Sequence, residues 1–255
     1  MAVLLILLAI VARYAWMQRG GRSTDWTRTQ RVAVIVVERA GEEVDPALVK
    51  KFRRAGPKVE AAMHEARSKY GANGAEPIEF EVFGPVPETV LLPPEPSDDL
   101  IELVQFNRAL SDYASVHDEA AGVNESYFDT RIYMRTSSTT GLLQVAEGVS
   151  QQDGGIGVVA VEINDKGIDF AWFVVLHEFF HTCGALDKYG EDGLPLNPEG
   201  LCDPGQQPLY PQAGTEIMAR GRPVSASREV LPGPPSTWTV GEWTARDVGW
   251  LRAQE

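Results

Sequence analysis

Short runs of apolar residues predict four β-strands in the first two thirds of the chain. They lie at residues 31–37, 78–83, 129–135 and 158–163. The first run (RVAVIVV) is continuously β-branched, which is typical of a strand buried on both faces, whereas the second alternates between apolar and polar positions. The sequence therefore predicts a sheet with at least one fully buried strand.

Helical periodicity separates these runs. One helix is expected to start with Asp45 as its N-cap and proline at the first helical position, to break at residues 56–57 (Gly-Pro), and to resume as far as residue 70. Two further amphipathic helices are expected at residues 100–116 and 240–252. Thr239 is a candidate cap for the last of them.

Glycine and proline mark the segments that are expected to be loops. Residues 85–96 (PVPETVLLPPEP) should form an extended loop, and residues 190–235 should be largely irregular. A chain of 255 residues with 44% hydrophobic residues can bury one substantial core. We therefore expect one domain over residues 27–255, preceded by an N-terminal segment and linker at residues 1–26.

The candidate chemistry lies in a segment that is apolar on every side. Residues 170–176 (FAWFVVL) predict a helix buried in the core, and His177, Glu178 and His181 follow directly. Residues four apart share a helix face, so the two histidines can direct their imidazoles at a single ion. Glu178 is rotated around the helix axis, where it can reach a water on that ion without being a ligand.

Two residues beyond the histidines extend this pattern. Gly184 can end the helix with a positive φ and turn the chain back sharply. Such a turn would bring Asp187 to the ion as a third ligand and leave a fourth position open for water. A later glutamate, Glu199 or Glu216, is the alternative third ligand.

The spacing HExxHxxGxxD, from His177 to Asp187, resembles the metzincin metalloproteases, in the variant with aspartate as third ligand and a tyrosine two residues later, here Tyr189. Residues 215–219 (TEIMA) resemble the Met-turn of that clan, with Met218 beneath the metal site. The resemblance implies an α+β zincin fold. It has a twisted mixed sheet and an active-site helix over a loop-rich C-terminal subdomain that ends in a helix.

In that clan an edge strand borders the cleft and pairs with an extended substrate, which leaves residues 129–135 and residues 158–163 both open as the edge. The resemblance further implies one Zn²⁺ ion and a polypeptide substrate, with Glu178 as the general base. Tyr189 and Tyr210 are candidates for stabilising the oxyanion. Two alternatives stay open: a membrane-tethered zinc-binding protein without turnover, and a zinc hydrolase of small amides or cell-wall peptides.

The N-terminus carries an uninterrupted apolar run, AVLLILLAIVA at residues 2–12, followed by Arg13. Tyr14 and Trp16 would suit a membrane interface, so residues 2–17 are expected to form a membrane anchor. A cleaved signal peptide, which would make the protein secreted or periplasmic, is the alternative. The side of the membrane stays open.

Charge and cysteine content narrow the picture further. A net charge of −13 argues against nucleic acid as a partner, because phosphate binding needs a basic face. The chain has two cysteines, Cys183 within the motif and Cys202 in the loop beyond it. A disulfide between them and two reduced thiols are both open, depending on the redox compartment.

Overall fold

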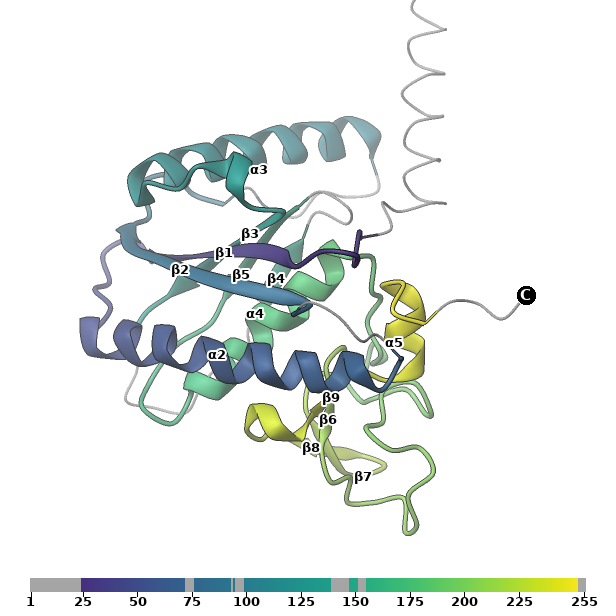
Figure 1. The fold of residues 1–255 in the computed structure, drawn as a ribbon. Coiled ribbons are helices and arrows are strands. Elements are labelled where there is room, and N and C mark those ends of the chain that lie inside the picture. The colour runs from purple at the N-terminus through teal and green to yellow at the C-terminus, as the bar shows by residue number, and fades with distance from the viewer. Residues whose placement is uncertain are drawn as a thin grey trace, which may run out of the picture.

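A computed structural model describes residues 24–71, 76–92, 94, 99–138, 147–150 and 155–251. Its centre is a five-stranded sheet with the order β2-β1-β3-β5-β4 (Figure 1). The strands are β1 (Gln30–Glu38), β2 (Ile78–Pro87), β3 (Thr130–Thr136), β4 (Glu147–Ser150) and β5 (Ile156–Ala160). Neighbouring strands are parallel except β4, which pairs antiparallel with β5 at the edge.

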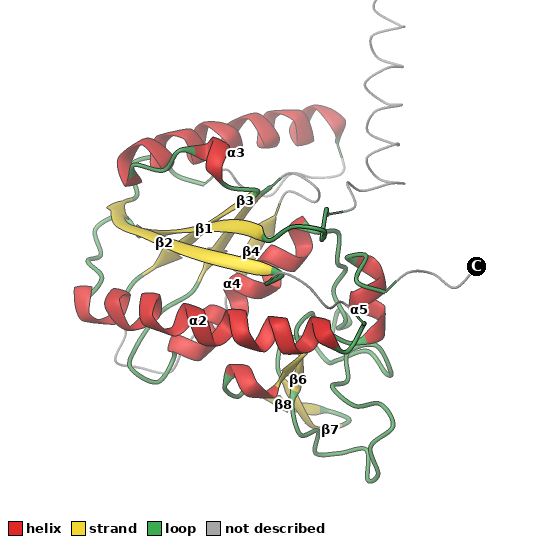
Figure 2. Cartoon of the chain, viewed as in Figure 1, coloured by secondary structure: helices red, strands yellow, loops and turns green. Residues whose placement is uncertain are grey.

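Helices cover both faces of this sheet. Figures 1 and 2 show α3 (Leu100–Ala121) on one face, and α2 (Pro46–Ser68) with α4 (Ile168–Thr182) on the other. Side chains of β1 alternate between the two resulting cores. Val32, Val34 and Val36 belong to the core with α2 and α4, whereas Ala33, Ile35 and Val37 belong to the core with α3. The expected buried character of this strand is therefore confirmed.

The expected break at residues 56–57 is wrong, because α2 continues through Pro57 without interruption. Asp45 caps the helix as expected, accepting a hydrogen bond from the Ala47 N–H. Gly56 lies against the Trp172 ring, where an added Cβ would come within 3.3 Å of it. Trp172 also stacks on Phe52 and donates a hydrogen bond to its carbonyl. Tertiary packing of this kind outweighs the local preference of proline.

The observed strands match the four expected runs approximately, and the differences lie mainly at the two edges of the sheet. β2 continues to Pro87, so it takes in part of the loop expected at residues 85–96. Prolines are tolerated there because β2 is an edge strand. The opposite edge is β4, a strand that the sequence did not predict. β3 and β5 are both internal, so neither of the two segments considered for that edge occupies it.

The C-terminal part lies below α4 in Figure 1 and consists mainly of loops, as expected. It contains two short pairs of strands, β6 (Thr215–Glu216) with β9 (Trp238–Thr239), and β7 (Arg222–Ser225) with β8 (Arg228–Val230). Single 3₁₀ turns lie at η1 (Glu125–Tyr127) and η2 (Pro235–Thr237).

The final helix is shorter than predicted. α5 spans Glu242–Asp247, and its N-cap is Gly241 rather than Thr239. Gly249 follows with φ 81°, a left-handed conformation that glycine adopts readily and that ends the helical segment. Of the 13 residues expected to be helical at 240–252, the six of Glu242–Asp247 form the α-helix.

The expected membrane anchor at residues 2–17 lies outside the described residues. Within the described ranges, no helix is both long enough and apolar enough to cross a bilayer. Trp26, at the end of the expected linker, packs into the core and donates a hydrogen bond of 2.6 Å to the Val248 carbonyl. The fold as a whole is a mixed α/β arrangement with a largely parallel sheet and, in its described part, four α-helices.

Candidate metal centre

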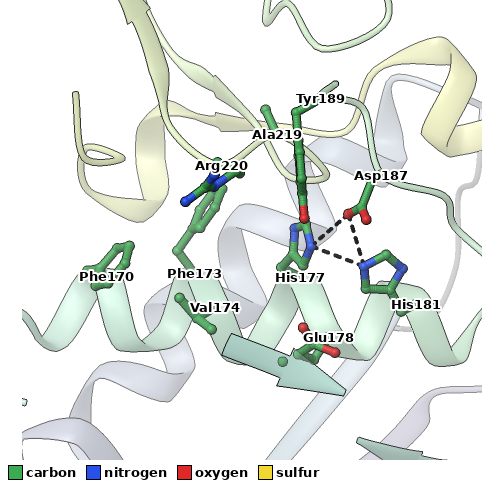
Figure 3. Close-up of a pocket in the computed structure, with 11 residues that line it drawn as sticks. Phe170, Phe173, Val174, His177, Glu178, His181, Asp187, Tyr189, Ala219 and Arg220 are labelled. Atoms are coloured by element: carbon green, nitrogen blue, oxygen red, sulfur yellow. Dashed lines mark hydrogen bonds and ion pairs between the residues drawn. The ribbon is translucent and has the colours of Figure 1, made fainter. Parts of the chain in front are cut away.

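The two motif histidines and Asp187 converge on one point. His177 Nε2 and His181 Nε2 lie 3.1 Å apart, and Asp187 Oδ1 lies 3.2 Å from the first and 3.1 Å from the second (Figure 3). A tetrahedral zinc ion with ligands at ~2.0–2.2 Å requires ligand atoms about 3.3 Å apart. The triangle therefore has nearly the dimensions of three corners of a zinc tetrahedron.

Hydrogen bonds at the far side of each imidazole fix its orientation. His177 Nδ1 lies 2.9 Å from the Ile217 carbonyl oxygen, and His181 Nδ1 lies 2.9 Å from the Ala185 carbonyl oxygen. A carbonyl oxygen can only accept, so both Nδ1 atoms donate. In the neutral imidazoles the Nε2 atoms then carry lone pairs that can bind a metal ion, whereas in the protonated imidazoles they donate to Asp187. The donor set of two imidazoles and a carboxylate at this spacing suits zinc.

A tight turn after α4 delivers Asp187 to this point. Gly184 has φ 97°, and its N–H donates to the His181 carbonyl. Farther along, the Leu186 N–H and the Lys188 ammonium both donate to the Asp247 carboxylate of α5, at 3.3 and 2.7 Å. The flanking residues of Asp187 are thus tied to the C-terminal helix, which holds the turn in place.

The Asp187 carboxylate is anionic in this setting. Burial acts to raise its pKa, but hydrogen bonds to His177 and His181 and the charges of these imidazoles outweigh burial and hold the pKa well below its usual value. Its side chain is 42% exposed, so one side of the triangle faces the cavity rather than the core. That open side is where the fourth ligand of an ion would lie.

Glu178 lies beside the triangle, 6% exposed and covered by the edge strand β4. One of its carboxylate oxygens lies within 4.8 Å of one ring nitrogen of each histidine, so the His177, Glu178 and His181 cluster is compatible with an HExxH metal site. Asp187 Oδ1, at 3.2 and 3.1 Å from the two Nε2 atoms, completes the triangle. In Figure 3 the Glu178 carboxylate lies between α4 and β4, on the other side of the histidines from Tyr189.

Glycines on the sheet make room for this arrangement. A Cβ at Gly148 of β4 would lie 1.8 Å from Glu178 Oε1. A Cβ at Gly157 of β5 would lie 2.7 Å from Ile132 Cδ1 and 3.7 Å from Glu178 Cβ. The absence of a side chain at both positions lets α4 approach the sheet and leaves space for the carboxylate of Glu178. Sequence reasoning missed Gly148, because nothing in the segment identified it as a strand.

The turn at residues 215–219 packs against the centre and holds one of its histidines. Ile217 supplies the carbonyl that holds His177, and the neighbouring Met218 is fully buried in the same core as α4. Fully buried Glu216 accepts hydrogen bonds from the Met218 N–H, the Gly241 N–H and the Thr244 hydroxyl. Burial raises the pKa of Glu216, and these three donors act against that rise.

Neither alternative third ligand reaches the histidines. The carboxylate of Glu216 instead accepts hydrogen bonds from the turn at residues 215–219 and from the start of α5. Glu199 lies 4.0 Å from the Lys188 ammonium with its side chain 40% exposed. The position of a third ligand is therefore occupied by Asp187 alone among these three acids.

The two candidate tyrosines lie in different places. Tyr189 lines the cavity, and its ring lies parallel to that of His177, with centroids 6.3 Å apart. Burial, assisted by the negative charge of Asp187, raises the pKa of Tyr189 to about 12, so its hydroxyl keeps its proton and can donate. Tyr210 is not among the residues that line this cavity.

The two cysteines do not form a disulfide in the structure. Cys183 is buried at the C-terminal end of α4, whereas Cys202 lies in a separate cavity with Lys69 and Trp238. The loop after α4 is therefore not held by a disulfide between them.

Comparisons with known proteins leave the centre to be interpreted from its own geometry. No family model matches the chain, and no curated protein matches it. A solved structure described as "Structure of a chaperone-substrate complex" is 11% identical, with a TM-score of 0.35, over 88% of this chain. The match spans 35% of that structure's chain, and at this TM-score it carries no argument about fold or function.

Proposed function

We propose that the chain is a zinc-dependent peptide-bond hydrolase of the metzincin type. The observation that carries this proposal is the convergence of His177 Nε2, His181 Nε2 and Asp187 Oδ1 within 3.1–3.2 Å of one another. The adjacent carboxylate of Glu178 supports it further, because a metal site that served structure alone would not need a buried acid beside an open ligand position.

Zn²⁺ held by these three side chains would polarise a substrate carbonyl and lower the pKa of water from 15.7 towards ~7. Glu178 takes the proton from the attacking water and then delivers it to the leaving amine. Glu178 lines the same cavity as the two histidines and Asp187, within which such a water would be bound. Tyr189, protonated at neutral pH, donates a hydrogen bond to the oxygen that becomes negative during attack.

The edge strand suits an extended polypeptide substrate. β4 pairs with β5 on one side only, so its other side offers backbone groups beside Glu178. An extended peptide that adds to such an edge gains backbone hydrogen bonds without a demand on its side chains. Anchoring of this enzyme to a membrane through residues 2–17 remains part of the proposal.

The test is a casein-cleavage assay on the purified soluble body, residues 24–255, loaded with zinc. Wild-type protein is expected to cleave casein, and chelator is expected to abolish cleavage. Glu178→Gln should retain zinc and lose turnover by on the order of 10²–10⁴-fold, the usual contribution of a general base. Zinc-loaded wild type that leaves casein and unstructured peptides intact would instead favour a zinc-binding protein without turnover.

A further inference from the structure

The cavity at the metal centre continues along α4 beyond the ligands. Phe170, Phe173 and Val174 lie one and two turns before His177 on the same helix face, and all three line the cavity. They are at most 9% exposed, so they form an apolar wall. The cavity holds about 200 Å³, which is room for one substrate side chain beside the metal centre.

One cation, Arg220, lines this apolar part of the cavity. It directly follows the turn at residues 215–219, and Figure 3 shows it over Phe173 and on the opposite side of His177 from Asp187. Its guanidinium carbon lies 5.8 Å from the Tyr189 ring centroid, within range of a cation–π interaction. A Cβ at Gly193 would come within 2.5 Å of Arg220 Nη1, so the Gly193 turn packs directly against the side chain.

Arg220 forms no ion pair within 4.0 Å among the residues that the structure describes. Burial raises the pKa of Glu229 of β8, and the nearby charge of Arg220 acts against that rise. Arg220 is exposed, in contrast to the partly buried Arg131 and Arg135, each of which is paired with a carboxylate. Arg220 is thus an oriented cation whose charge is available at the wall of the cavity.

We propose that this part of the cavity is a specificity subsite for a substrate carboxylate, with Arg220 as the partner that binds it. The inference rests on the proposed peptidase function and names the substrate class of that site. Phe173 and Val174 are one helical turn, about 5.4 Å, from His177, which places the subsite beside the residue that flanks the scissile bond. The carboxylate can come from an Asp or Glu side chain or from the C-terminus of a short peptide.

The test uses matched peptides that differ only in charge. Glu is compared with Gln at each position flanking the cleavage site, with the C-terminus amidated, and a second pair compares the free C-terminal acid with the amide. Zinc-loaded wild type is expected to favour one carboxylate-bearing member by about tenfold in kcat/KM, as a charge-assisted hydrogen bond allows. The pair that shows this ratio identifies the source of the carboxylate.

Variants connect the preference to Arg220. Arg220→Gln should bring the ratio of acidic to neutral peptide close to one, and Arg220→Glu should favour a lysine peptide instead. Arg228→Gln, which removes an exposed arginine of the following β7–β8 hairpin that does not line the cavity, should leave the ratio unchanged. Zinc content, measured for each variant, separates loss of the subsite from loss of the metal centre.

The outcomes separate this inference from the proposed function. Equal kcat/KM for all pairs in wild type, or an acidic preference that survives Arg220→Gln, overturns the subsite while peptide cleavage stands. Absence of all cleavage overturns the proposed function itself. In that case the subsite is tested by peptide binding to zinc-loaded Glu178→Gln, measured by calorimetry. Equal Kd values for the acidic and neutral peptides would overturn the subsite.

Discussion

Replacement of Gly148 by alanine tests the placement of Glu178, the proposed general base. A Cβ built at this position lies 1.8 Å from Glu178 Oε1, whereas real Cβ atoms keep at least 3.0 Å from such neighbours. The carboxylate and β4 must therefore move apart by about 1.2 Å. A displacement of ~1 Å at a catalytic group costs on the order of 10² in rate, or about 2.7 kcal/mol in the activation barrier.

Stability should change much less than activity in Gly148→Ala, because the atom that must move is the end of a flexible side chain at an exposed strand. We expect kcat for a peptide substrate to fall on the order of 10²-fold, while zinc content stays at the wild-type value and Tm shifts by only a few degrees. The assay combines steady-state kinetics, metal analysis and thermal unfolding on the same preparations.

Gly205→Ala is the matched control for that experiment. Gly205 is exposed, and its added Cβ would approach only Asp203 Oδ1, at 3.4 Å, which is ordinary contact. The control should keep wild-type kinetics. If Gly148→Ala also cleaves at the wild-type rate with full zinc content, Glu178 does not need the position in which the structure holds it, and its assignment as the base is refuted.

Three further predictions concern the metal centre. Asp187→Ala should lower zinc affinity at least tenfold in a chelator competition, and Glu199→Ala should not; equal affinities would exclude Asp187 as a ligand. Zinc should be released on acidification, because protons compete for the imidazoles. Burial acts to lower the pKa of His181, but the hydrogen bond to Asp187 and the charges of Glu178 and Asp187 outweigh it and raise the pKa, which favours release as the pH falls; a zinc affinity that does not decrease on acidification would contradict this. Asp247→Asn removes the charged partner of the Lys188 ammonium, which is only 5% exposed. This substitution should lower the free energy of unfolding by about 3 kcal/mol and weaken zinc binding. An unchanged denaturation midpoint would contradict the role of Asp247 in holding the turn.

The helix with the histidines could be predicted because its signal is local. An apolar stretch of a full two turns fixes α4, and the four-residue spacing fixes the common face of His177 and His181. Gly184 and Asp187 could be predicted for the same reason, since one positive-φ turn connects them to the helix.

Features that depend on distant segments could not be predicted in this way. The continuity of α2 through Pro57 depends on Trp172, more than 100 residues away, and β4 is four residues with no distinct apolar pattern. The need for glycine at position 148 is evident only from the tertiary structure, in which β4 packs against Glu178. Glu216, which the sequence offered as a ligand, is instead directed inward by donors from α5. Arg220 belongs to no sequence motif, and only the structure shows that it lines the cavity.

Diffraction from crystals of the zinc-loaded protein, recorded at the zinc absorption edge, tests the central claim most directly. We expect one anomalous peak, ~2.0–2.2 Å from His177 Nε2, His181 Nε2 and Asp187 Oδ1, with the fourth coordination position directed towards the cavity. A peak bound by other residues, or an Asp187 side chain directed away from the two imidazoles, would contradict it.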